Sequence, residues 1–124
     1  MTRVRFRGVD LEVDVPLGAR LLDAARAAGA PEGSRCAGVC ACSTCHVHVR
    51  SGAEHLSLPT DEEKDVVDLA CEVPDADSRL GCQARVVSEG LVEVEIAEES
   101  FRAWLEAATP EERERGVRLW ARRR

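Results

Sequence analysis

The sequence predicts an α+β domain followed by a shorter helical segment. Its 124 residues correspond to one domain with room for an appendage. Five stretches alternate between apolar and polar residues as strands do: 3–7, 11–15, 46–50, 83–87 and 91–96. Helical spacing of apolar residues separates these stretches at two places, over 21–28 and after Thr60. Strands and helices that do not strictly alternate along the chain are typical of the α+β class.

The first 31 residues predict a β-hairpin and then a helix. The link Gly8-Val9-Asp10 between the first two alternating stretches has the composition of a hairpin turn. The helical pattern that follows consists of Leu21, Leu22, Ala24, Ala25 and Ala28. Gly29-Ala30-Pro31 should end this helix. Periodicity alone therefore establishes a ββα unit and no further topology.

Four of the six cysteines fall within ten positions, between Cys36 and Cys45. Thiolates are soft ligands that suit iron–sulfur clusters or zinc, and a [2Fe–2S] cluster takes four of them. Cys36, Cys42, Cys45 and Cys82 have the spacing C-x5-C-x2-C-x36-C. That spacing is one residue longer in its first gap than the plant-type C-x4-C-x2-C…C pattern. We therefore expect these four cysteines to hold one [2Fe–2S] cluster.

The residues around these cysteines are suited to contact a cluster. Gly38 can adopt a positive φ angle, and the hydroxyls of Ser43 and Thr44 can donate hydrogen bonds to sulfur. His46 either hydrogen-bonds locally or acts as a ligand of the Rieske kind, and we favour the local role because four cysteines complete the site. We expect His48 and His55 to lie on the surface.

Two other uses of the cysteines are weaker. A secreted disulfide framework is disfavoured, because the chain opens directly in a strand pattern and the cysteines are clustered. A structural zinc module or a redox sensor is a further alternative, but structural zinc sites usually pair cysteines as C-x2–4-C. Cys71 is interpreted as a small buried apolar residue.

Three stretches of the chain carry a family resemblance. They are Cys36-x3-Cys40-Ala-Cys-Ser-Thr-Cys-His46-Val47, Thr60-Asp-Glu-Glu63 with Asp65 and Asp68-Leu-Ala70, and Ser78-Arg-Leu-Gly-Cys-Gln-Ala-Arg85. They resemble the adrenodoxin-type [2Fe–2S] ferredoxins and, through Cys40, the bacterial ISC-type ferredoxins in particular. The resemblance covers about residues 1–97 and implies a β-grasp (ubiquitin-like) [2Fe–2S] ferredoxin fold. Residues 98–124 match nothing in that pattern and are expected to be a helical C-terminal extension.

The helix that begins at Thr60 is strongly acidic. Thr60 is a good N-cap, and Glu63 has the position that completes a capping box. Four acidic residues recur at i, i+4, i+7 and i+11 and form a stripe along the helix: Asp61, Asp65, Asp68 and Glu72. Glu62 is a further acid in the first turn. A stripe of one charge sign is usually a solvated face, but it can also steer transient partners. The resemblance implies that this helix docks basic patches on the reductase and on acceptors. Arg79, just before Cys82, is expected to hydrogen-bond loop carbonyls.

The tail, residues 98–124, predicts two amphipathic helices. Phe101, Trp104, Leu105 and Ala108 form one apolar stripe, and Val117, Trp120 and Ala121 form another. The signature Thr109-Pro110-Glu111-Glu112 separates the two helices. We expect both helices to fold back on the domain or on a second copy of it. Partner docking, oligomerisation and a basic membrane-surface helix are the alternatives.

The resemblance implies a one-electron carrier and not an enzyme. A ferredoxin reductase, an NAD(P)H-dependent flavoprotein, would reduce it. The ISC-type pattern implies that the acceptor is the cysteine desulfurase–scaffold complex of iron–sulfur cluster assembly; a haem-thiolate monooxygenase is the alternative. Cys40 could have a part in sulfur handling or partner chemistry. We expect a cytoplasmic protein with no nucleic-acid partner and no stable membrane insertion, because no apolar run reaches the ~18 residues that a membrane helix needs.

Overall fold

A computed structural model describes residues 1–7, 9, 11–31, 46–68 and 77–121 of the chain. The elements follow in the order β1 (Thr2–Phe6), β2 (Leu11–Val15), α1 (Leu21–Ala28), β3 (His46–Ser51), the 3₁₀ turn η1 (Ala53–His55), α2 (Asp61–Asp68), β4 (Ser78–Leu80), β5 (Leu91–Ile96), α3 (Glu98–Ala107) and α4 (Pro110–Ala121). Within the described residues, no helix has the length and apolar character needed to cross a membrane.

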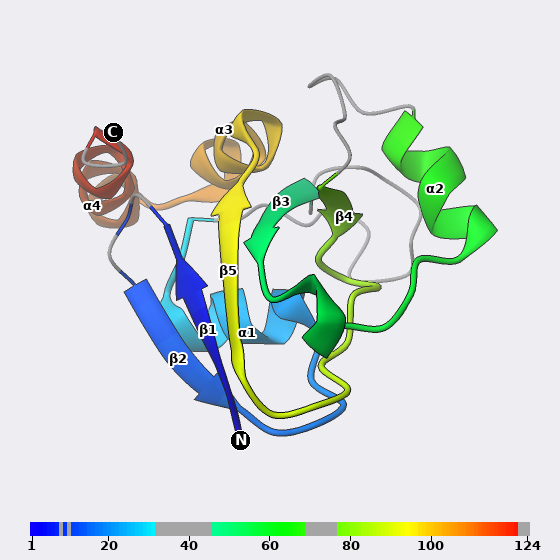
Figure 1. Cartoon of the computed structure of the whole chain (residues 1–124). Helices are drawn as coiled ribbons and strands as arrows, with labels where there is room; N and C mark the ends of the chain where they lie inside the picture. The colour runs from blue at the N-terminus through cyan, green and yellow to red at the C-terminus, as the bar shows by residue number, and fades with distance from the viewer. Residues whose placement is uncertain (8, 10, 32–45, 69–76, 122–124) are drawn as a thin grey trace.

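The described strands form one mixed sheet with the order β2-β1-β5-β3-β4. The central pair, β1 and β5, is parallel, and the three other pairs are antiparallel. Helix α1 lies across one face of this sheet (Figure 1). The predicted α+β class is therefore confirmed, and the arrangement is the β-grasp that the resemblance implied.

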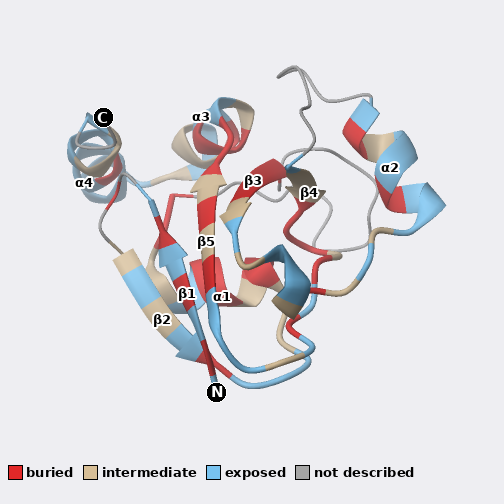
Figure 2. Ribbon diagram, viewed as in Figure 1, coloured by how far each residue is buried: buried red, intermediate tan, exposed pale blue. Residues whose placement is uncertain are grey.

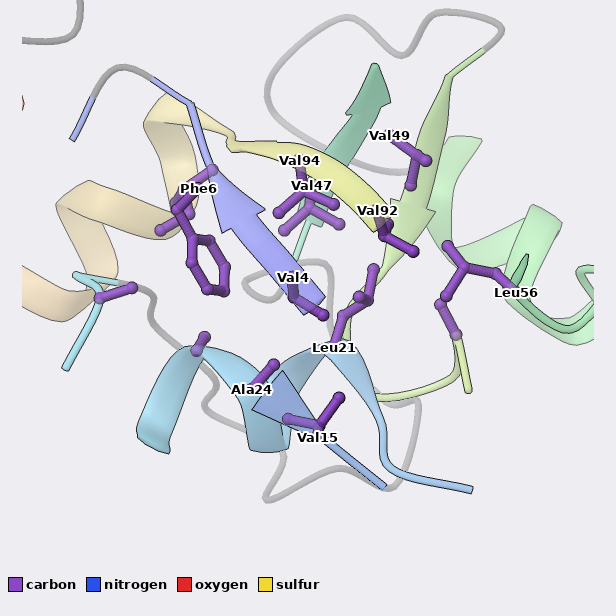
Figure 3. Close-up of a cluster of buried hydrophobic side chains, with 14 of the residues drawn as sticks. Val4, Phe6, Val15, Leu21, Ala24, Val47, Val49, Leu56, Val92 and Val94 are labelled. Carbon is purple, nitrogen blue, oxygen red and sulfur yellow. The ribbon is translucent and has the colours of Figure 1, made fainter. Parts of the chain in front are cut away.

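The hairpin and α1 build the main core as their patterns predict. Strand β1 alternates buried and exposed residues, and β2 pairs with it from Thr2↔Val15 to Phe6↔Leu11. Figure 3 shows side chains of β1, β3 and β5 meeting those of α1 in an aliphatic cluster around one aromatic ring, Phe6. Helix α1 ends at Gly29, which has a φ angle of 71°, a left-handed conformation that glycine adopts at little cost.

One predicted strand is absent and another was missed. Residues 83–87 make only the isolated bridges Arg20↔Arg85 and Leu56↔Val86, so the strand predicted there is wrong. Their alternation arises because Ala84 and Val86 are buried while Arg85 and Val87 are exposed. The backbone of Val86 hydrogen-bonds residues 18 and 19, and that of Arg85 and Val87 hydrogen-bonds residues 55 and 57 on the other side. The missed strand is β4, whose three residues are too few to show a period.

The C-terminal segment forms the two predicted helices, and both pack on the domain. The Phe101 and Trp120 rings stack with centroids 4.2 Å apart, and Leu119 and Trp120 also contact the main core. Figure 1 shows α3 following directly from β5, with α4 at the edge of the molecule opposite α2. The fold-back on the domain is therefore confirmed. The division into units at residues 1–97 and 98–124 stays a prediction.

Candidate metal centre

Of the four predicted cluster ligands, Cys82 lies among the described residues. The other predicted ligands and loop residues lie outside them: Cys36, Gly38, Cys40, Cys42, Ser43, Thr44 and Cys45. Cys71 and Glu72 also lie outside the described residues. The site is therefore built from its described wall, which consists of β3, β4, α2 and the residues that follow β4.

Cys82 lies in a small apolar pocket directly after β4. Its side chain packs with Leu22, Val67 and Leu80, and the residue is only 2% exposed. The Gln83 side-chain amide donates a hydrogen bond to Cys82 Sγ over 3.5 Å. Gly81, next to it, is also buried. A buried thiolate with an N–H donor fits a cluster sulfur ligand, because such donors stabilise negative charge on sulfur.

A buried ion pair orients the strand that leads to Cys82. The Arg79 guanidinium donates to both carboxylate oxygens of Glu63, over 2.6 and 3.1 Å. Leu80 N–H donates to the same carboxylate over 3.0 Å, and Arg79 also donates to the Ser57 carbonyl over 2.7 Å. Glu63 is 1% exposed, so this fork–fork pair joins α2 to β4 in the interior.

The capping-box interpretation of Glu63 therefore needs a correction. Glu63 N–H does donate to Thr60 Oγ1 over 3.1 Å, so Thr60 caps the helix as expected. The Glu63 carboxylate, however, turns inward to Arg79 instead of returning to the Thr60 backbone. The physical reason is that burying Arg79 without a counter-charge would be costly. The expectation that Arg79 hydrogen-bonds a loop carbonyl is met at Ser57.

His46 is completely buried, and both of its ring nitrogens have hydrogen-bond partners. Nδ1 lies 2.9 Å from Glu99 Oε1 on α3, and Nε2 lies 2.8 Å from Ser78 Oγ on β4. With both nitrogens engaged, the geometry agrees with the local role and disfavours a ligand of the Rieske kind. The expectation that His48 lies on the surface is wrong: it is buried, with its ring centroid 4.7 Å from that of His46. His55, which is half-buried, hydrogen-bonds Ser88.

The acidic stripe is exposed over all of its described length. Asp61, Glu62, Asp65 and Asp68 all face solvent on α2, beside the pocket of Cys82. Figure 2 shows α2 as an outlying helix with an exposed outer face. Val67 anchors its inner face in the apolar pocket, with the partly buried Val66 packed against it. The helix thus places negative charge outside the wall that carries Cys82.

The wall shows what this end of the molecule can do chemically. Among the residues that the structure describes, no three histidine, cysteine or acidic side chains gather as a metal-ligand group. Cys82 alone therefore cannot form a metal site, and a cluster here needs the thiolates of the loop between α1 and β3. The described wall would supply one thiolate, an apolar pocket that excludes water, and rigid attachments to α2 and α3.

Two acidic residues of this site were not predicted as part of it, Glu63 and Glu99. Glu63 had a plausible local role as a helix cap, so its sequence position gave no sign of burial. Glu99 lies beyond the stretch that carries the resemblance. No sequence pattern relates either acid to its partner, since Glu63 is 16 residues from Arg79 and Glu99 is 53 from His46.

Comparisons with known proteins agree with this picture. Residues 4–87 match the family model described as the 2Fe-2S iron-sulfur cluster binding domain. The 2Fe-2S ferredoxin of Haemophilus influenzae is 44% identical over 96 residues, which cover 77% of this chain and 83% of the relative.

Among solved structures, an ISC-like [2Fe-2S] ferredoxin from Pseudomonas putida is 36% identical, with a TM-score of 0.70, covering 79% of this chain and 94% of that one. Putidaredoxin in a covalent complex with putidaredoxin reductase is 24% identical, with a TM-score of 0.64, covering 77% and 97%, and this likeness concerns the fold alone. The chain belongs to the adrenodoxin-type [2Fe–2S] ferredoxins that its sequence resembles, electron carriers that hold one [2Fe–2S] cluster.

Proposed function

We propose that this ferredoxin carries single electrons in the cytoplasm from an NAD(P)H-dependent flavoprotein reductase to the cysteine desulfurase–scaffold complex of iron–sulfur cluster assembly. Cys36, Cys42, Cys45 and Cys82 are the proposed ligands. The cluster supplies reversible one-electron chemistry. The observation that carries the proposal is the buried thiol of Cys82 beside an exposed acidic helix.

The described residues serve electron transfer by holding this wall still. The Glu63–Arg79 pair and the Leu80 N–H bond fix the strand before Cys82, and the apolar pocket keeps water from its sulfur. A site that hardly moves between oxidation states needs little reorganisation, which favours rapid transfer. The Gln83 amide that donates to Cys82 Sγ also favours extra negative charge at this sulfur.

Docking is assigned to the exposed acids of α2. Asp61, Glu62, Asp65 and Asp68 present one charge sign on one helix, and Glu72 continues the stripe in sequence. Such a surface attracts a basic partner over long range and releases it readily, as a shuttling carrier requires. Putidaredoxin, which shares this fold, is seen in a covalent complex with putidaredoxin reductase. That complex supports a flavoprotein reductase as the electron donor of this chain.

The ligand assignment predicts the colour of variants. Changing any one of the four proposed cysteines to serine should bleach the purified protein or make its cluster labile, because four thiolates are needed. Cys40→Ser and Cys71→Ser are matched controls, and they should stay brown. Visible absorption and iron analysis measure both results. A colourless wild-type protein with stoichiometric zinc would contradict the assignment.

The docking assignment predicts slower reduction when the stripe is neutralised. Asp65→Asn with Asp68→Asn should slow reduction by the reductase about 10-fold at low salt, because steering charge is lost. Stopped-flow absorbance measures the rate, and the visible spectrum should not change. Glu12→Gln with Asp14→Asn, on β2 at the opposite edge of the sheet from β4, is the matched control. Equal rates of reduction in the two double variants would show that the acidic stripe is an ordinary solvated face without a docking role.

The acceptor is tested by comparing how fast each candidate acceptor oxidises the reduced ferredoxin. The reduced protein is mixed with the desulfurase–scaffold complex, and oxidation of the ferredoxin is timed together with cluster formation on the scaffold. Rapid oxidation that depends on the desulfurase supports the assembly role. Rapid oxidation by a haem-thiolate monooxygenase, with none by the assembly complex, would overturn this choice of acceptor and leave the electron-carrier function intact.

A further inference from the structure

The side chain of Glu99, in the C-terminal extension, contacts His46 in the described wall of the candidate metal centre. Glu99 lies in the first turn of α3, outside residues 4–87 that match the family model. Its carboxylate nevertheless lies 2.9 Å from Nδ1 of His46, the residue that follows Cys45. His46 is 0% exposed and the Glu99 side chain is 10% exposed, so their contact is shielded from solvent.

The backbone makes a second connection at the same place. Ala97 N–H donates to the His46 carbonyl over 3.1 Å, just before α3 begins. The segment joining β5 to α3 therefore holds His46 by its main chain, while Glu99 holds it by its ring. These two hydrogen bonds, from residues only two apart in the chain, restrict both the position of His46 and the orientation of its imidazole.

The other ring nitrogen continues the connection toward Cys82. A carboxylate oxygen is an acceptor, so Nδ1–H donates to Glu99, and in the neutral ring Nε2 then accepts the Ser78 hydroxyl at 2.8 Å. Ser78 begins β4, the strand that the Glu63–Arg79 pair attaches to α2 and that leads to Cys82. One chain of hydrogen bonds thus joins α3 to the two strands that flank the site.

We propose that Glu99 is a positioning residue of the [2Fe–2S] centre. It orients His46, and through His46 it holds the end of the loop that carries Cys45 and the start of β4. The C-terminal extension is then a working part of the centre, and its function goes beyond covering the core. This inference rests on the ligand set given under Proposed function. Partners of this kind, one step removed from the ligands, commonly govern the affinity and electronic properties of a metal site.

Glu98 offers a matched control one residue away. It carries the same charge in the same turn of α3, but it is half-exposed and pairs with Arg102 over 2.7 Å at the surface. Replacing Glu98 therefore changes the charge and first-turn composition of α3 as replacing Glu99 does, without touching the His46 ring. A difference between the two positions reports the contact with His46.

The test compares four full-length holoproteins: Glu99→Ala, Glu99→Gln, Glu98→Ala and Glu98→Gln. Glu99→Ala should lose iron to a chelator about 10-fold faster than wild type. This is the low end of the loss of metal affinity seen when hydrogen-bond partners of metal ligands are replaced. The midpoint potential and visible circular dichroism of Glu99→Ala should also shift. Glu99→Gln keeps an oxygen acceptor for Nδ1–H and should restore the dichroism and the slow iron loss. Both Glu98 variants should match wild type.

Two results would overturn the proposal. One is a Glu99→Ala protein with wild-type potential, dichroism and iron loss, whatever its melting temperature, since that pattern means a merely structural contact. The other is an equal change in the Glu98 and Glu99 variants, since that pattern reports charge alone. The ligand set fails separately, if Cys45→Ser keeps its colour, so the two proposals are distinguished by different variants.

Discussion

Helices α2 and α4 occupy opposite edges of the molecule and are attached to it in different ways (Figure 1). Helix α2 is joined through a charged pair, Glu63 with Arg79, whose side chains are 2% and 12% exposed. Helix α4 is joined through stacked rings: Trp120 lies on Phe101 with an interplanar angle of 2°, and Trp104 lies against Gly116. Figure 2 shows both helices with exposed outer faces.

The difference shows what each edge requires. A bidentate pair of charges has strict geometry, so it fixes the angle between α2 and β4 beside Cys82. Stacked rings are less directional and contribute mainly by removing apolar area from water. The contact at the edge of the candidate metal centre therefore fixes the orientation of α2, whereas the contact at the edge formed by the tail mainly buries apolar area.

The largest effect is expected from breaking the charged pair. Glu63→Ala leaves Arg79 buried without its partner and the Leu80 N–H without its acceptor, which should lower the free energy of unfolding by about 3–5 kcal/mol. The visible circular dichroism of the cluster should change as well, because the strand before Cys82 loses its anchor. Urea unfolding measures the first effect.

The neighbouring acid provides the control for this change. Glu62→Ala removes an exposed carboxylate from the same helix turn and should change stability by no more than about 0.5 kcal/mol. If the two alanine variants unfolded at the same urea concentration, the buried pair would have no special role in holding α2.

A smaller effect is expected at the apolar edge. Glycine in a helix is normally less stable than alanine by about 1 kcal/mol, so Gly116→Ala would stabilise an isolated α4. Here a Cβ at this position would overlap the Trp104 ring, so the ring must move. Overpacking of this kind costs about 1–3 kcal/mol, and we expect Gly116→Ala to lower the melting temperature without altering cluster dichroism.

Removing the ring is the matched experiment for Gly116. In a Trp104→Ala background the overlap is gone, and Gly116→Ala should then be neutral or stabilising. A stabilised Gly116→Ala protein with Trp104 intact would show that α4 is held less closely than the contact indicates.

The smallest effect is expected at the start of α4, and it depends on pH. Thr109 and Glu112 form a reciprocal capping box, each accepting the other's backbone N–H over 3.2 Å. Hydrogen bonding to the Thr109 side chain and then to its backbone N–H lowers the pKa of Glu112 from its ordinary value of 4.5. A carboxyl with a lowered pKa in the folded state stabilises above its unfolded pKa, and this contribution disappears as the pH falls through the folded value.

Glu112→Gln should therefore melt below wild type near neutral pH, and the two should converge in acid. Melting curves from about pH 7 to about pH 3 follow this loss. Glu111→Gln removes a charge from the same turn but not the bonds to Thr109, so its difference from wild type should be smaller. A Glu112→Gln difference that stays constant into acid would contradict the assignment.

Much of the fold was predictable because its signals are local. These signals each lie within a few consecutive residues. They are the alternation in β1, β2 and β5, the apolar spacing in α1 and the capping pattern at Thr109. The strand predicted over 83–87 failed for the same reason, since its alternation reports burial of Ala84 and Val86 and not a neighbouring strand. The prediction that His48 lies on the surface failed because α3 and β4 cover β3 at this position.

The sequence by itself predicted the [2Fe–2S] cluster that the family holds, because cysteine spacing is a property of the chain, and the ligand set drawn from that spacing stays a proposal. It also predicted the exposed acids of α2, since most charged side chains of an amphipathic helix face solvent. Only the tertiary structure decided which acids turn inward. Glu62 and Glu63 are neighbours of like charge, as are Glu98 and Glu99, and in each pair one faces solvent while the other turns toward the interior. The inward member is selected by Arg79 or His46, far away in sequence, because a polar group withdrawn from water must find a partner wherever the fold supplies one.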